Sequence, residues 1–332
     1  MARTRTMSLA AALTASSAGT AYGLLVEQSK WARKAIGPPT QPPRADGLYY
    51  PHAAAPASSA ELTLALIGDS TAAGLGCERA EELPGVLLAR GLAEETGQAV
   101  RLHTYAVVGA TSKTLDEQVS GALVERPPDA AVILIGANDV TAKLSIAGSA
   151  ARLGAAVVSL RGRGTVVVVG TCPDLGAVRP IPQPLRSVAR SWSLRLARAQ
   201  GEQVRAAGGH AVALADLLSP EFLTRPELFF STDQFHPSAA GYEAASAVLL
   251  PAVCAALGVW GGGPLAVPPL RSATAEARRP TARLTAALNR ELNQRARAGG
   301  RWATQLLRKG DVRRGNVHRA DVHRADVRRA RD

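Results

Sequence analysis

LTLALIGDS, at residues 62–70, is the stretch on which the fold of this chain depends. An uninterrupted apolar run of this length predicts a strand that is buried on both faces of a sheet. The run ends in Gly68-Asp69-Ser70, a turn that carries a hydroxyl group. In an open parallel sheet, the turns at the carboxyl ends of the strands display their side chains in a shared crevice. Ser70 is therefore expected at such a crevice.

Four more apolar runs follow along the chain, and segments with helical spacing separate them. The runs are Val100–Val108, Ala130–Ile135, Thr165–Val169 and Ala211–Ala215, and the helical segments are 78–96, 112–124, 141–161, 187–207 and 237–257. Strands that alternate with helices form βαβ units, whose sheet is parallel and covered on both faces. The sequence therefore predicts an α/β fold with three layers, α/β/α, and a central parallel sheet over residues 61–258.

The N-terminal segment, residues 1–36, has the pattern of an export or anchoring signal. Arg3 and Arg5 precede an uncharged stretch at 6–26, which is rich in small and apolar residues. This pattern predicts a signal peptide or, because the stretch is 21 residues long, an uncleaved membrane anchor. The protein is then secreted or membrane-anchored; the alternative is a cytoplasmic protein with an N-terminal helix.

Two further segments have no apolar period. Residues 37–60 are rich in Pro and Ala and are expected to form a linker. Residues 259–332 form a basic extension: from Arg271 onward, 17 Lys and Arg stand against 6 Asp and Glu, so the tail carries +11 of the net charge of +12. Its last part repeats every five residues with one valine per repeat, which predicts disorder. Since no folded nucleic-acid reader accompanies the tail, nucleic acid is not an expected partner.

Neither a metal nor a cofactor is expected. Cys77, Cys172 and Cys254 lack metal-type spacing and are expected to be small buried side chains. The chain has no Walker loop and no His-Glu-x-x-His, and the pair Gly74 and Gly76 lacks the third glycine of a dinucleotide fingerprint.

Three residues could together form a nucleophile with its base. A serine hydroxyl is a poor nucleophile at neutral pH and needs a neighbouring base, which a carboxylate orients. Asp233 and His236 stand three residues apart just before a predicted helix, where the imidazole could reach Ser70. Taken separately, each of these residues could also be a helix cap or a surface side chain.

Two more polar groups are expected at the same edge of the sheet. Asn138 follows a strongly apolar run, and its amide could donate to an oxyanion. Gly109 has no side chain, so its N–H could approach the same oxygen closely. Each could equally be an ordinary turn residue. Asp139 is expected to be a cap or network residue.

Taken together, the four blocks resemble those of the SGNH hydrolase superfamily, the GDSL-type esterases and lipases. The blocks are Gly68-Asp69-Ser70, Gly109, GAND at 136–139 and DQFH at 233–236, in the chain order of that family. The resemblance covers about 200 residues, 61–258, and implies a flavodoxin-like three-layer fold. Thr71 stands where the name-giving motif has Leu, a position without a chemical role.

The resemblance implies a serine esterase that works through an acyl-enzyme. Ser70, Asp233 and His236 would be catalytic, and Ser70, Gly109 and Asn138 would form the oxyanion hole. The substrate would be an ester of a small molecule, a lipid or a carbohydrate. The Pro-rich segment from Cys172 to Pro184 is expected to wall the pocket. The alternative is a non-catalytic binding module on the same fold, with a tail that binds polyanions or membrane surfaces.

Overall fold

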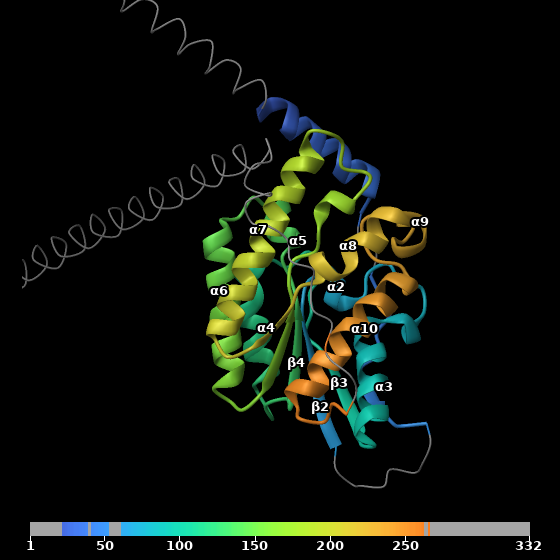
Figure 1. Ribbon diagram of the computed structural model, residues 1–332, viewed down its shortest axis with the longest axis vertical. Coiled ribbons are helices and arrows are strands. Elements are labelled where there is room, and N and C mark those ends of the chain that lie inside the picture. Colours follow the sequence, from blue (N-terminus) through green and yellow to red (C-terminus); the bar gives the residue numbers. More distant parts are fainter. Residues whose placement is uncertain (1–21, 39–40, 53–60, 262–264, 266–332) are drawn as a thin grey trace, which may run out of the picture. The chain divides into compact units, whose positions relative to one another are not determined.

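The computed structural model describes residues 22–38, 41–52, 61–261 and 265. Six strands form one sheet in the order β1-β3-β2-β4-β5-β6, and helices cover both of its faces (Figure 1). Without the edge strand β1, this is the 2-1-3-4-5 order of flavodoxin-like sheets. The predicted three-layer α/β/α fold with a central parallel sheet is therefore confirmed.

Five parallel strands coincide with the five predicted apolar runs. They are β2 (Glu61–Gly68), β3 (Ala99–Thr104), β4 (Ala130–Leu134), β5 (Val166–Gly170) and β6 (His210–Val212). Every residue of β4 is buried, and β5 begins with four consecutive valines, because helices enclose these strands on both sides. β6 is shorter than the predicted run, since the chain turns into a helix at Leu214.

The helices that form the outer layers coincide with predicted segments, whereas several short ones were not predicted. The outer helices are α3 (Pro84–Thr96) and α10 (Ala239–Ala256) on one face, and α4 (Leu115–Ala122), α6 (Ile146–Arg161) and α7 (Leu185–Ala206) on the other. The other helices are α2 (Ser70–Ala73), α5 (Ala137–Thr141), α8 (Leu214–Thr224), α9 (Pro226–Phe229), η1 (Ala80–Glu82), η2 (Ser112–Thr114) and η3 (Leu175–Ala177). The helix predicted at 141–161 begins only at Ile146, because α5 ends at Thr141 and Lys143 between them adopts a left-handed conformation with φ of 58°.

The alternation of side chains along β2 supplies two separate cores. Leu64 and Leu66 point to the face of α3 and α10, and Ala65 and Ile67 point to the face of α4, α6 and α7. All four side chains are fully buried. The strand can be apolar throughout because both of its faces are core faces.

Part of the segment expected to be a linker belongs to the sheet. Residues Gly47–Tyr49 form β1, which pairs antiparallel with β3 and places Leu48 opposite Arg101. The linker prediction for 37–60 is therefore wrong at these three residues. Proline-rich sequence has no apolar period, but the edge of β3 offers unpaired backbone groups that a short strand can satisfy.

Residues 22–36 are helical, and their side chains contact the folded domain. Leu25 and Ala32 are buried on this helix. The carboxamide of Gln28 donates to the carbonyl oxygen of Gln183 at 2.7 Å and accepts the N–H of Leu185 at 3.1 Å. The rest of the predicted signal or anchor, residues 1–21, and the repeats of the basic tail lie outside the described residues.

Helix α10 is long and apolar enough by composition to cross a membrane. Its side chains Tyr242, Leu249 and Val253 are nevertheless buried in the core beside α3. It therefore has the contacts of a core helix. Cys77, Cys172 and Cys254 are all free thiols and buried, as predicted.

The contact between β2 and β4 at Gly68 leads to a prediction about folding. Gly68 has φ of +140°, and a Cβ atom there would lie 1.9 Å from the carbonyl oxygen of Leu134. Gly68→Ala should therefore lower the free energy of unfolding by more than about 4 kcal/mol or prevent folding, as measured by urea denaturation.

Gly97→Ala is the matched control for this substitution. Gly97 also has a positive φ, +65°, but a Cβ atom there would meet nothing within 4 Å. This exchange should cost only about 1 kcal/mol. If both variants lose the same unfolding free energy, the positive φ angle, and not the close contact between the strands, is the reason that residue 68 must be glycine.

Candidate active site

The turn after β2 is held by hydrogen bonds on both sides. The carboxamide of Gln118 accepts the N–H of Gly68 at 2.7 Å and donates to its carbonyl oxygen at 3.0 Å. The N–H of Asp69 donates to the carbonyl oxygen of Leu134 on β4. Because the backbone groups of Gly68 and Asp69 have partners, Ser70 starts α2 in a defined position.

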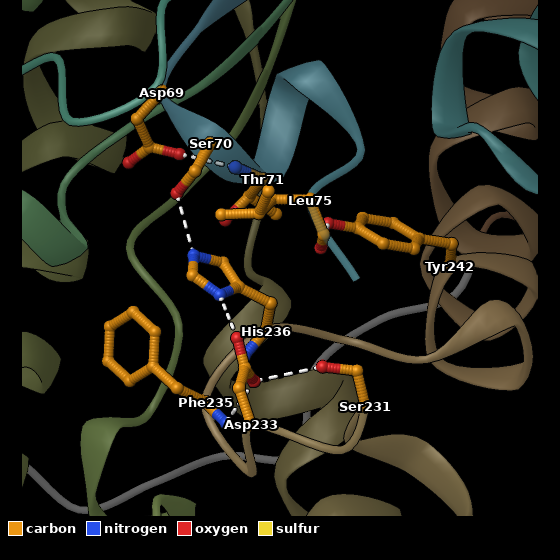
Figure 2. A network of polar contacts seen from close by, with 9 residues as sticks. All are labelled: Asp69, Ser70, Thr71, Leu75, Ser231, Asp233, Phe235, His236 and Tyr242. Atoms are coloured by element: carbon orange, nitrogen blue, oxygen red, sulfur yellow. Dashed lines mark hydrogen bonds and ion pairs between the residues drawn. The ribbon is translucent and has the colours of Figure 1, made fainter. Parts of the chain in front are cut away.

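Ser70, His236 and Asp233 form one continuous series of hydrogen bonds (Figure 2). The hydroxyl Oγ of Ser70 lies 2.9 Å from Nε2 of His236, and Nδ1 of the same ring lies 2.6 Å from Oδ2 of Asp233. Ser70 and His236 are both buried. The structure thus brings together the three residues that the sequence suggested as nucleophile, base and orienting acid.

Asp233 is surrounded by donors that favour its charged form. Burial raises the pKa of this carboxyl group, but hydrogen bonds from the His236 side chain and from the backbone of His236 and Phe235 outweigh it and lower the pKa to about 2. The hydroxyl of Ser231 also donates to it, at 2.8 Å. A carboxylate that stays ionised keeps a proton on Nδ1 of the imidazole and leaves Nε2 free to accept one.

The loop that carries the histidine closes on itself. The N–H of Ser231 donates to the carbonyl oxygen of His236 at 2.8 Å, and Gln234 adopts φ of 55° between them. The ring of Phe235 meets that of His236 edge-on, with centroids 4.8 Å apart. From the adjoining helix, the buried hydroxyl of Tyr242 donates to the carbonyl oxygen of Leu75, just beyond α2.

A hydrogen bond joins the loop that carries Gly109 to helix α5, which carries Asn138. The side-chain amide Nδ2 of Asn138 donates to the carbonyl oxygen of Ala110 at 2.9 Å. This bond uses one amide hydrogen and leaves the second available. Gly109 has φ of +82°, and within the described residues no hydrogen bond occupies its N–H. The loop of Gly109 is also tied to the turn that carries Ser70, because the N–H of Val107 donates to the carbonyl oxygen of Gly68.

The buried carboxylate of Asp139, for which the sequence suggested no specific partner, also connects α5 to η2, the segment that follows Gly109. Asp139 is 1 % exposed and accepts hydrogen bonds from the N–H and the hydroxyl of Ser112. Nε of Arg152, on α6, donates to the same hydroxyl at 3.0 Å. Asp139 is thus the network residue that was expected. Arg152, Ser112 and Gln118 were missed, because no motif distinguishes them in the sequence.

A cavity of about 90 Å³ adjoins this group of residues. Its walls include Asp69 and Thr71, which flank Ser70, and also His236. The Pro-rich segment that was expected to form a wall contributes residues 173–175, 177 and 178. We call this space the inner cavity.

Asp69 differs sharply from Asp233 in its surroundings. Burial raises the pKa of Asp69 to about 6, and the hydrogen bonds from Thr71 oppose this rise only in part. The N–H of Thr71 donates to it at 2.9 Å, which caps α2. Asp69 is therefore protonated much more readily than Asp233, which stays ionised.

A serine, a histidine and an acid joined in this way, at the carboxyl edge of a flavodoxin-like sheet, define the class of serine hydrolases. The model of the GDSL-like lipase/acylhydrolase family matches residues 66–244, and the chain belongs to this family. The chain is 51 % identical over 269 residues to the GDSL-like esterase Rv1075c of Mycobacterium tuberculosis, which covers 77 % of this chain and 85 % of the relative. It is an ester-hydrolysing serine hydrolase, and the predicted family is confirmed.

Solved structures with similar folds are more distant. A lipase/acylhydrolase from Enterococcus faecalis has 21 % identity and a TM-score of 0.45, over 57 % of this chain and 93 % of that one. The acetylxylan esterase Axe2 from Geobacillus stearothermophilus has 17 % identity and a TM-score of 0.43, over 59 % and 94 % of the two chains.

The buried carboxyl group of Asp69 should make stability depend on pH. Its pKa is about 6 in the folded protein and close to 3.9 in an unfolded chain. The folded state therefore holds the proton more tightly, and the stability that this provides is lost as pH rises from about 4 through 6. Asp69→Asn should be more stable than the wild type at pH 8 by up to roughly 3 kcal/mol, and this advantage should vanish at pH 4.

Chemical denaturation at the two pH values measures this difference. Asp116→Asn is the control, since Asp116 is exposed on α4 and the same exchange there should not change the pH dependence. If Asp69→Asn is more stable than the wild type by the same amount at pH 4 and at pH 8, then burial of the Asp69 carboxyl group is not the cause of the pH dependence.

Proposed function

We propose that the protein hydrolyses carboxylic esters through an acyl-enzyme, with Ser70 as nucleophile, His236 as base and Asp233 as the group that orients the base. The observation that carries this proposal is the hydrogen-bond series from Ser70 through His236 to Asp233, with distances of 2.9 and 2.6 Å. A serine needs this arrangement because its hydroxyl becomes nucleophilic only as the base removes its proton.

In the first step, Oγ of Ser70 attacks the ester carbonyl carbon while its proton moves to Nε2 of His236. The ester C–O bond then breaks, and the imidazolium gives this proton to the departing alcohol. Asp233 stabilises the imidazolium and itself stays ionised, in agreement with the low pKa of its carboxyl group.

The negative charge that develops on the carbonyl oxygen needs donors that are already in place. We assign this role to the N–H groups of Ser70 and Gly109 and to the second amide hydrogen of Asn138. The hydrogen bond from Asn138 to Ala110 supports this assignment, because it fixes the rotation of the amide. The hydrogen bonds from Ser112 to Asp139 support it further, since they tie η2, just after the loop of Gly109, to α5, which carries Asn138.

In the second step, water attacks the acyl carbon and His236 accepts its proton. The imidazolium then returns the proton to Oγ of Ser70 as the C–O bond to the serine breaks. The products are a carboxylic acid and the free enzyme. Both steps therefore use Nε2 of His236 as the proton acceptor.

Mutation of the proposed nucleophile and base tests the mechanism. Ser70→Ala and His236→Ala should each lower kcat on p-nitrophenyl butyrate by three or more orders of magnitude, and the double variant should be little worse than either. The matched controls are Ser120→Ala and His210→Ala, at exposed positions on α4 and β6. These controls should retain wild-type turnover.

A fluorophosphonate probe provides an independent reading of the same residue. The wild type should be labelled at Ser70 and the Ser70→Ala variant should not be labelled. Wild-type activity of that variant would refute the assignment, and a protein that takes no label would be a binding module.

We also propose that the N-terminal segment attaches the protein to a lipid surface, as part of a secreted or membrane-anchored protein. Leu24 and Trp31 lie seven residues apart on one face of the helix and are 50 % and 58 % exposed. Lys30 and Lys34 lie on the same helix, and an uncharged stretch at 6–21 precedes it. Exposed aromatic and basic side chains together favour an interface with anionic lipid.

Flotation with vesicles that contain one-third phosphatidylserine tests this attachment. A chain that starts at residue 22 should bind these vesicles, and Trp31→Ala in that chain should weaken binding severalfold. Trp260→Ala provides a tryptophan control.

Removal of residues 271–332 should reduce the salt-sensitive part of binding and leave hydrolysis of a soluble ester intact. Equal binding of the chain with and without Trp31 would contradict the proposed role of the helix.

A further inference from the structure

The walls of the inner cavity are mostly apolar, which favours an apolar ligand. The cavity lies between β4, η3, α8 and α10, on the side of the sheet that carries α10. Most of its walls are apolar side chains, and they include Leu134, Leu175, Val178, Leu214, Phe222 and Phe230. Among the described residues that line it there is no Lys or Arg. A hydrocarbon group gains most from such walls.

The polar groups of the cavity do not favour an ionic ligand. Asp174 already pairs with Arg190, at 3.2 Å, and accepts the hydroxyl of Ser219. Asp69 is occupied by the N–H of Thr71, and its carboxylate would repel an anion. The hydroxyl of Thr171 is buried and, within the described residues, has no hydrogen-bond partner. Among the described lining residues, no lysine or arginine is therefore placed to bind an anion.

The order of the two chemical steps indicates which part of an ester lies in this cavity. The alcohol must leave and water must enter from the same side of His236, so the alcohol side has to stay open. The acyl group stays bonded to Ser70 through both steps and can occupy a space that water does not enter. The residues on either side of Ser70 form walls of the cavity, so a group bonded to Ser70 is close to it.

We propose that the inner cavity binds the hydrocarbon chain of the acyl group, and that the enzyme therefore prefers esters of linear fatty acids longer than acetate. This inference rests on the proposed function of Ser70. It names α8 and α10, which supply no catalytic side chain, as the elements that determine the length of the acyl chain.

A series of p-nitrophenyl esters with a constant leaving group tests the preference. From acetate to butyrate and hexanoate, kcat/KM should rise by about fourfold for each CH₂ group that becomes buried. The rise should stop when the chain fills the cavity. A profile in which acetate is the best substrate would overturn the proposal.

Helix α10 offers a pair of matched variants. Ala245 lines the cavity, whereas Ala247, two residues further on, is exposed. Ala245→Leu should lower the ratio of kcat/KM for hexanoate over acetate by about tenfold or more, because it fills the space for the chain. Ala247→Leu adds the same side chain outside and should leave the ratio as in the wild type. Equal ratios for the two variants would refute the proposal.

Two further variants keep the test decisive if Ala245→Leu does not fold. Leu218→Ala enlarges the cavity from α8 and should move the best substrate to a longer chain. Thr171→Val exchanges the unpartnered hydroxyl for a methyl group and should raise the ratio of kcat/KM for hexanoate over acetate, because the wall becomes more apolar. Loss of hexanoate hydrolysis in Thr171→Val alone would show that the occupant is polar and would overturn the assignment.

Alkyl acetates with alcohols of increasing length separate the two halves of an ester. If Ala245→Leu changes selectivity along this alcohol series and not along the acyl series, the cavity binds the alcohol and the proposal is wrong. Failure of the proposed function would look different, because Ser70→Ala would then hydrolyse every ester at the wild-type rate.

Discussion

The close approach of β2 and β4 at Gly68 is the constraint on which the active site depends. The two strands are so near that a single methyl group on residue 68 would collide with the carbonyl oxygen of Leu134. The next N–H, that of Asp69, donates to this same oxygen, so the sheet continues to the residue before the nucleophile. Ser70 is therefore placed by sheet geometry, and its hydroxyl meets a histidine that lies 166 residues away in the chain.

Buried glutamines supply the hydrogen bonds that the sheet cannot provide beyond its ends. Gln118 bonds to both backbone groups of Gly68, and Gln200 accepts the N–H of Cys172 while it donates to the carbonyl oxygen of Ile135. Gln28, which is only half-buried, bonds in the same two-sided way to the loop at 183–185. A carboxamide carries a donor and an acceptor, as a peptide group does, so it can make the two hydrogen bonds that a neighbouring strand would otherwise make. Loops that would otherwise need water partners are thereby held in place.

Two aspartates on either side of Ser70 show how local hydrogen-bond donors set the charge of a carboxyl group. Asp233 receives hydrogen bonds from a hydroxyl, an imidazole and two backbone N–H groups, and its pKa falls to about 2. Asp69 is more deeply buried with hydrogen bonds from Thr71 alone, and its pKa rises to about 6. The first can therefore act as a fixed negative charge beside His236, whereas the second serves as a helix cap and a wall of the inner cavity.

The sequence by itself determined the layers, the five parallel strands and the turn that carries Ser70, because buried strands and amphipathic helices leave periodic patterns that need no knowledge of distant contacts. It also supplied the candidates Gly109, Asn138, Asp233 and His236 through short motifs. Only the tertiary structure decided which polar groups meet: Gln118 with Gly68, Arg152 with Ser112, and β1 with β3. Such pairs join residues far apart in the chain, and the same side chains would look ordinary on any exposed helix. The inner cavity belongs with them, since its volume depends on how the walls from separate helices and loops pack against one another.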